Sequence, residues 1–288
     1  MLQYYKKQGY SLIDAEEWME KAISTSLRPN EVCISFDDGL KCQFDIAAEV
    51  LEKNDLTAFF FVPSQRFIGE RENLELFRHF RFSQFADIDQ FYHSFFRILE
   101  QSTIYKQKKW KSLLSKFKPE EYLSEFSFYT PADRKFRYIR DDLMTEQEYY
   151  DFMFEMMERF HYNVEEAEKN LYMNHAEITE LHRKGHILGL HSHTHYTNLA
   201  NVSKERQFWE FQTNQRILEE IIGKKIRVAS YPCNSYNKES LQIMRELGVA
   251  LAFRANMEEG FTSVLELPRE DHSNIIRRMK DENYGVYQ

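Results

Sequence analysis

Short apolar runs alternate along this chain with segments in which apolar residues recur at helical spacing. Residues 32–36, VCISF, and 56–63, LTAFFFVP, have the length and the β-branched and aromatic content of buried strands. Residues 43–53, between them, place apolar residues on one face of a helix. Two strands separated by a helix form a βαβ unit, so we predict a parallel sheet with a right-handed crossover.

The alternation returns after Asn174, a residue type that often caps the start of a helix. Gly185 and Gly248 then mark the ends of two predicted helices. The two ends of the chain together therefore predict an α/β core. The further predicted helices span 3–9, 12–23, 175–184, 203–222 and 238–247, and the further predicted strands span 186–191, 226–232, 250–255 and 264–268.

The middle of the chain has a different pattern. Residues 66–173 contain no convincing strand, and their apolar residues recur at helical spacing. We predict a helical insertion over 66–173 and an α/β domain built from 1–65 and 174–288. The insertion also holds two basic clusters, 106–111 and 134–140, which we interpret as solvated helix faces rather than as a surface for an anionic substrate or a lipid headgroup.

Composition narrows the partners and the compartment. The net charge is −8, with acids and bases interspersed, so the broad basic surface that a nucleic acid requires is not expected. No stretch approaches 18 consecutive apolar residues, which argues against a transmembrane segment. The three cysteines show no CxxC spacing, which suits a reducing compartment, and we predict a cytoplasmic location.

Two polar motifs follow predicted strands. Asp37 and Asp38, in SFDDG, come directly after the 32–36 strand, and HSHTH follows the 186–191 strand. Strand ends of one parallel sheet share an edge, where ligands bind in α/β folds. His191 and His195, at i and i+4, could join one carboxylate in a three-ligand metal site with an open position. An Asp-Gly turn and a polar histidine loop are the simpler alternatives.

The same motifs carry a family resemblance. SFDDG followed downstream by HSHTH resembles the paired signature of the polysaccharide deacetylase family, carbohydrate esterase family four, and flanking segments such as KNDLTAFFFVP and LELPRED resemble family segments in the same order. The resemblance implies a distorted (β/α) barrel. It assigns Asp37 as the base and Asp38, His191 and His195 as metal ligands, and it leaves His193 as a non-ligand.

The sequence also departs from the family pattern. The arginine expected before the Pro-Tyr-Gly motif is absent from ASYPCN, so Arg269 is our candidate for orienting Asp37. The backbone N–H of Cys233 takes the place of the family's oxyanion donor. No late Leu-x-His motif is found, and His272 is only a nearby candidate for the general acid. The insertion is large, and the strand that usually opens the barrel has no counterpart here.

The resemblance implies a metal-dependent hydrolase that removes an acetyl group from an N-acetylated sugar. The ion would be zinc, with cobalt, nickel or iron as alternatives, and the partner would be a carbohydrate, with peripheral contact to a lipid-linked substrate left open. A formamido-sugar deformylase and a non-catalytic metal- and sugar-binding relative are alternatives. A mononuclear iron oxygenase also uses two histidines and one carboxylate, but it has no use for the second acid.

The insertion leaves and re-enters the core beside the proposed site. We predict that it covers the site. If it does, basic and aromatic residues of the insertion would help recruit a large or anionic carrier. The alternative is a decoration on the side of the barrel. The residues expected to serve in recruitment are Lys108, Trp110, Arg137 and Tyr138.

Overall fold

The computed structural model describes residues 1–107, 110–123, 129–258, 260 and 263–284. The chain divides into two compact units. Unit 1 combines Met1–Glu72 with Tyr172–Gln288, and unit 2 is Asn73–Leu171. The functional division at 1–65, 66–173 and 174–288 stays a prediction.

Unit 1 contains all the strands of the described residues, and helices separate most of them. The strands are β1 (Ser11–Leu12), β2 (Glu31–Val32), β3 (Ile34–Phe36), β4 (Ala58–Val62), β5 (Ile187–Leu190), β6 (Val228–Ser230) and β7 (Leu251–Phe253). The helices are α1 (Leu2–Lys7), α2 (Ala15–Ile23), the π-helix η1 (Gln43–Ala48), α3 (Glu49–Glu52), α11 (His175–Arg183), α12 (Lys204–Ile222), α13 (Lys238–Glu246) and α14 (His272–Asp281), with short 3₁₀ turns η2 (Gln65–Ile68), η4 (Leu199–Asn201) and η5 (Pro232–Asn234).

Five strands form one parallel sheet in the order β3-β4-β5-β6-β7, and β1 and β2 form a separate parallel pair. The predicted α/β fold with a parallel sheet is therefore confirmed, and the sheet is a five-stranded half-barrel. The predicted strand 32–36 is divided at Cys33 between β2 and β3. The strand predicted at 264–268 is wrong, because the described residues there turn and make only one isolated bridge, Leu267 to Phe253.

Alternate residues of the strands face two apolar layers, as strand geometry requires. Phe60 and Val62 of β4 belong to a core that also contains residues of α11, α12 and α13. Phe59 and Phe61, one position earlier in each case, pack instead with Trp18 and other residues of α2. These two layers bury the sheet on both sides and hold its carboxyl edge rigid.

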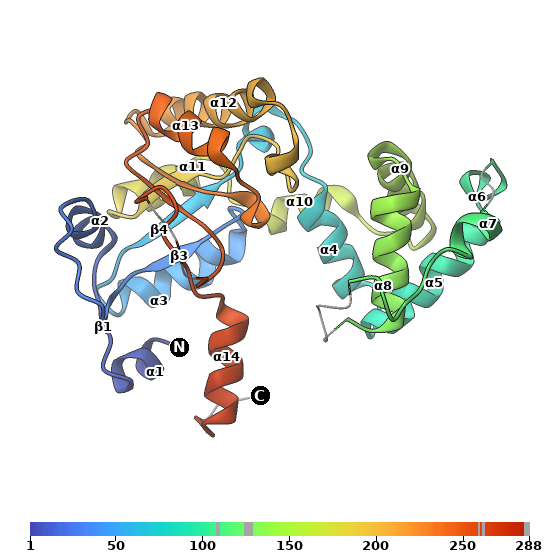
Figure 1. The fold of residues 1–288 in the computed structure, drawn as a ribbon, viewed down its shortest axis with the longest axis horizontal. Helices are drawn as coiled ribbons and strands as arrows, with labels where there is room; N and C mark the ends of the chain where they lie inside the picture. Colours follow the sequence, from blue (N-terminus) through green and yellow to red (C-terminus); the bar gives the residue numbers. More distant parts are fainter. Residues whose placement is uncertain (108–109, 124–128, 259, 261–262, 285–288) are drawn as a thin grey trace. The chain divides into compact units, whose positions relative to one another are not determined.

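Gly189 of β5 is required by packing. A Cβ atom at this position would lie 2.4 Å from Cδ1 of Phe61, which is closer than real Cβ contacts. Helices α11, α12 and α13 then cover one face of the sheet, with α12 beside both α11 and α13 (Figure 1). The loop between β5 and α12, which contains HSHTH, is thus enclosed by the sheet and a long helix.

The regular elements of unit 2 are all helices in its described residues, and the unit has its own core. Its elements are α4 (Leu74–Ser83), α5 (Ile88–Gln101), α6 (Thr103–Gln107), α7 (Trp110–Leu114), α8 (Pro131–Tyr138), the π-helix η3 (Ile139–Leu143), α9 (Glu146–Arg159) and α10 (Val164–Leu171). Trp110, expected at a recruiting surface, is only 1% exposed because its ring stacks on Tyr105 and its indole N–H donates to the Ile104 carbonyl. Lys108 lies outside the described residues.

Two further findings concern membrane-spanning helices and cysteines. Within the described residues, none of the helices combines the length and the apolar content needed to cross a membrane. Within the described residues, Cys33, Cys42 and Cys233 form no disulfide. The cytoplasmic location stays a prediction.

Candidate active site

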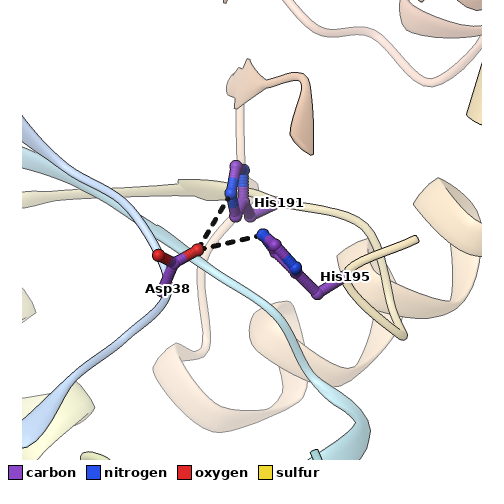
Figure 2. Close-up of side chains that lie close together, drawn as sticks. All are labelled: Asp38, His191 and His195. Carbon is purple, nitrogen blue, oxygen red and sulfur yellow. Dashed lines mark ion pairs between the residues drawn. The ribbon is translucent and has the colours of Figure 1, made fainter. Parts of the chain in front are cut away.

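The candidate site lies where β3 and β5 end. Asp37 and Asp38 follow β3 directly, and His191 follows β5 directly. The chain then turns sharply at both places, since Asp38 has a φ of 77° and His195 a φ of 51°. Such left-handed conformations are costly for residues other than glycine and are common at functional sites. Figure 2 shows the result, with Asp38, His191 and His195 pointing toward one another.

The distances within this group are short. Oδ1 of Asp38 lies 3.3 Å from Nε2 of His191 and 3.0 Å from Nε2 of His195. One ligand atom from each of the three residues lies within 4.8 Å of the others. The histidine side chains are 2% and 7% exposed, and Asp38 is 23% exposed. The group is therefore shielded on the histidine side and open on the carboxylate side.

The donor set fits a divalent ion. Nδ1 of His191 lies 3.0 Å from the Ser230 carbonyl oxygen, which can only accept, so Nδ1 carries the proton. In the neutral ring, Nε2 then presents its lone pair toward Asp38. Two acceptors facing each other are stabilised by a cation between them, and two imidazole nitrogens with one carboxylate are ordinary ligands for such an ion.

Asp37 has different partners from those of Asp38. Its two carboxylate oxygens accept from the two terminal nitrogens of Arg269, each at 2.7 Å. Arg269 also donates to the Ser230 hydroxyl at 2.6 Å, and that hydroxyl lies 3.3 Å from Asp37. Arg269, chosen from the sequence, is therefore in bidentate contact with Asp37, the geometry that guanidinium and carboxylate groups favour.

Electrostatics keep both acids ionised. Burial raises the pKa of Asp37, but the charges of Arg269 and His191 and the hydrogen bonds from Arg269 outweigh burial and lower it. Burial likewise raises the pKa of Asp38, and its hydrogen bonds with His191 and His195 lower it by more. Arg269 supplies the counter-charge to Asp37, and an ion held between Asp38 and the two histidines would supply it to Asp38, so the two adjacent carboxylates could then be charged together.

His193 is not part of the group of three. Its side chain is 1% exposed, its Nδ1 lies 2.9 Å from the Ser64 hydroxyl, and its ring packs edge-on against Trp209. The Ser64 and Gln65 N–H groups both donate to the His193 carbonyl. His193 thus ties the motif loop to the segment after β4, which agrees with the non-ligand role that the resemblance implies.

Helix α12 holds the loop from the other side. The Asn214 side chain accepts from the His191 N–H at 2.8 Å and donates to the Val62 carbonyl at 2.9 Å. The buried Glu210 carboxylate accepts from the N–H groups of His193 and Thr194 at 2.9 and 2.8 Å. These contacts fix the backbone on which His191 and His195 stand.

Sequence reasoning missed both of these residues. A signal was present, because Gln207, Glu210 and Asn214 lie at i, i+3 and i+7, on a buried side of the helix shared with Phe211 and Leu218. Polar residues at core positions of a helix need buried partners. The sequence could have shown that partners exist, but not that they belong to the HSHTH loop.

Two further residues predicted to serve the site, Cys233 and His272, lie outside the group formed by Asp38, His191 and His195. Cys233 lies in η5, three residues after Ser230, with a φ of 50°, a conformation that favours glycine. His272 lies at the start of α14, with its side chain 70% exposed and 3.8 Å from Asp271. Among the described residues, no ion pair joins His272 to Asp37 or Asp38.

Comparison with known proteins agrees with this geometry. Residues 154–252 match the model of the polysaccharide deacetylase family. This range includes His191 and His195 and does not reach the two acids. The resemblance predicted from the two motifs is thereby confirmed. No curated protein matches the chain.

Solved structures share the fold at low sequence identity. The deacetylase PplD of Streptococcus pyogenes, in complex with acetate, is 16% identical, with a TM-score of 0.50, over 96% of this chain and 83% of that one. The deacetylase domain of BpsB from Bordetella bronchiseptica is 13% identical, with a TM-score of 0.52, over 93% and 81%. IcaB from Ammonifex degensii is 14% identical, with a TM-score of 0.52, over 93% and 79%. These likenesses establish the fold.

Proposed function

We propose that this relative of the polysaccharide deacetylases is a metal-dependent hydrolase that removes the acetyl group from an N-acetylated sugar. The observation that carries the proposal is the convergence of Asp38, His191 and His195, beside a second carboxylate, Asp37, that has a separate partner. A divalent ion held by the three residues would polarise the acetyl carbonyl and lower the pKa of a coordinated water.

The other residues have distinct roles in this proposal. Asp37 accepts a proton from the attacking water, and Arg269 holds the carboxylate in position. The N–H of Cys233 donates to the oxygen on which negative charge develops, a contact worth about 10²-fold or more in rate. Hydrolysis consumes one water and yields acetate and the free amine. The second acid and its arginine favour this reaction over iron-dependent oxygenation, which requires neither.

The proposal also includes a cytoplasmic location. The three cysteines form no disulfide among the described residues, which is compatible with a reducing cytoplasm. PplD, BpsB and IcaB have the fold but, at 13–16% identity, leave the substrate of this chain to experiment.

The test measures acetate release from a panel of N-acetylated mono- and oligosaccharides, with added zinc, cobalt, nickel or iron. Formate release from formamido sugars is measured in parallel, and so is oxygen consumption. We expect acetate release that depends on the ion and is abolished by chelation. Formate as the sole product would favour the deformylase, and glycan binding without either product would favour a non-catalytic relative.

We predict that His191→Ala loses the bound ion while His193→Ala keeps it. Nε2 of His191 points at Asp38, whereas His193 contacts Ser64 and Trp209 instead. Metal analysis of the purified variants, with melting temperatures to confirm folding, gives the comparison. Full metal occupancy in a folded His191→Ala protein would remove His191 from the ligand set.

A further inference from the structure

Unit 2 holds three arginines among its aromatic side chains. Arg81 comes from α4, Arg137 from α8 and Arg140 from η3, which continues α8. The guanidinium carbons of Arg81 and Arg140 lie 5.5 and 5.6 Å from the centre of the Phe136 ring. Arg137 lies three residues before Arg140, so Arg137 and Arg140 share one side of the helix, and the guanidinium carbon of Arg137 lies 4.0 Å from the centre of the Tyr129 ring. The charges of all three arginines oppose the rise that burial causes in the pKa of Tyr149, so all three lie near its hydroxyl.

The acids near these arginines do not balance them. Asp141 pairs with Arg140 through two contacts, of 2.5 and 2.8 Å. Asp133 accepts instead from the Tyr92 hydroxyl and from the N–H of Thr130. In the described part of the chain, Arg81 and Arg137 have no carboxylate partner, and the Nε atom of each is buried without a hydrogen bond.

Such an arrangement is costly without a counter-charge. A guanidinium group removed from water loses hydration that only hydrogen bonds or an opposite charge can replace. Burial lowers the pKa of Arg81, and the like charges of Arg140 and Arg78 lower it further, while Tyr149 and Tyr92 oppose this. Three arginines with one paired acid leave an excess of two positive charges, which a dianion neutralises.

We propose that Arg81, Arg137 and Arg140 form a binding site for a phosphate-class dianion, the phosphate or diphosphate group of a larger molecule. The planar guanidinium fork matches the geometry of phosphate oxygens, and a monocarboxylate would leave one of the two unpaired arginines without a counter-charge. The site lies within unit 2 and does not depend on the deacetylase activity proposed above.

The test titrates the full-length protein with inorganic pyrophosphate at constant ionic strength, by calorimetry. The variants Arg81→Met and Arg137→Met keep the apolar stem and remove the charge. The control is Arg159→Met, because Arg159 is 43% exposed and already pairs with Glu155 in the same unit. We expect about tenfold weaker binding for each site variant, no detectable binding for the double variant, and no change for the control.

Pyrophosphate also binds divalent ions, so the titration is repeated in a His191→Ala background. Binding that persists there and is lost with Arg81→Met and Arg137→Met belongs to unit 2. A nucleoside diphosphate and vesicles containing phosphatidic acid then distinguish a soluble carrier from a lipid headgroup. A probe that binds the parent and does not bind the double variant supports the site. It also shows whether the natural anion comes from a soluble carrier or from a lipid headgroup.

The outcomes separate this proposal from the proposed activity. Deacetylation of an uncharged N-acetylated sugar is expected to be the same in the double variant and in the parent. If the parent shows no activity but binds pyrophosphate through these arginines, the site stands and the activity fails. If the folded parent binds none of the three probes, or binds them as well without Arg81 and Arg137, the proposal is overturned.

Discussion

The adjacent carboxylates of Asp37 and Asp38 have different environments. Asp38 faces the two histidines, and Asp37 is held by Arg269, although only a peptide bond separates the residues. Successive residues at the end of a strand point in different directions, which lets one turn serve two purposes. In the proposed reaction, one acid binds the ion and the other handles the proton.

We predict that Asp37→Asn binds the ion normally but loses about 10²- to 10⁴-fold in acetate release, the usual contribution of a general base. The amide keeps the shape of the side chain and cannot accept the proton. Asp45→Asn is the matched control, because Asp45 is half exposed and its one ion pair within the described residues is with Lys41. Activity within a few-fold of the parent would exclude Asp37 as the base.

Individual site residues were predicted best from the sequence where they are neighbours along the chain. The motifs SFDDG and HSHTH identified the three converging side chains, and the absence of the usual arginine led to Arg269. The contact of Ser230 with both Asp37 and Arg269 could not be read in advance. It joins positions 37, 230 and 269, which only the folded sheet brings together.

Helix α12 shows how an element can serve a site that it does not enter. Asn214 and Glu210 hold the backbone of the HSHTH loop, and Glu210 also accepts from the Thr194 hydroxyl at 2.7 Å. Both side chains are fully buried and out of reach of water, so their polar atoms depend on these hydrogen bonds within the protein. The helix is therefore part of the machinery that positions the histidines.

We predict that Asn214→Ala weakens ion binding and destabilises the fold by about 1–3 kcal/mol, because the His191 N–H and the Val62 carbonyl are left without their partner. Gln212→Ala, on the exposed side of the same helix, is the control. Ion affinity by competition with a chelator and unfolding by urea give the two readings. Unchanged affinity in the Asn214 variant would contradict the positioning role.

Strand β2 supplies a prediction about pH. Glu31 is buried, and hydrogen bonds from Arg28 and Lys21 lower its pKa to about 2. A carboxyl with a lowered folded-state pKa stabilises the fold above its ordinary pKa, and that stability is lost as the pH falls through the folded-state value. We expect Glu31→Gln to be less stable than the parent at pH 6, and the difference to shrink toward pH 2.

Urea unfolding of the parent and of the variant between pH 2 and pH 6 measures this difference. Glu20→Gln, an exposed substitution in the nearby helix α2, serves as the control and is expected to follow the parent throughout. A stability gap for Glu31→Gln that stays constant across this range would contradict the assignment of the lowered pKa to Glu31.

Elements were predicted well where a run of apolar residues was long, as in β4, or where the helical stretch itself was long, as in α12. The error at 264–268 has a physical cause. VLELP alternates like a strand, but only Leu267 pairs with β7, and Pro268 has no N–H to extend the ladder. The burial of Trp110 was missed for a similar reason, since its neighbours in the sequence are mostly lysines and its partner is Tyr105.

The whole molecule has separate cores. Every apolar residue of the helical core, from Leu76 to Leu171, belongs to unit 2, whereas the two layers on the sheet draw only on unit 1. Each unit therefore buries its own hydrophobic surface, which is the condition for independent stability.

We predict that Phe152→Ala lowers the stability of unit 2 by about 3–5 kcal/mol, because the ring is fully buried and packs against Phe95. Ion binding in unit 1 should be unaffected. Phe82→Ala, 69% exposed in the same unit, is the control. Trp110 fluorescence reports on unit 2, and Trp18 on unit 1, when each is the sole tryptophan. Loss of ion binding together with unit 2 would show that the units are not independent.

The left-handed backbone at Asp38, His195 and Cys233 has a consequence for how this protein can be altered. Each of these residues adopts a conformation that glycine takes at no steric cost, so glycine there would relieve roughly 1–3 kcal/mol of strain. Laboratory selection for heat resistance alone would therefore favour glycine at these three positions. Two of those changes would remove proposed ligands, and only Cys233, which contributes its backbone, could be replaced in this way without loss of a ligand.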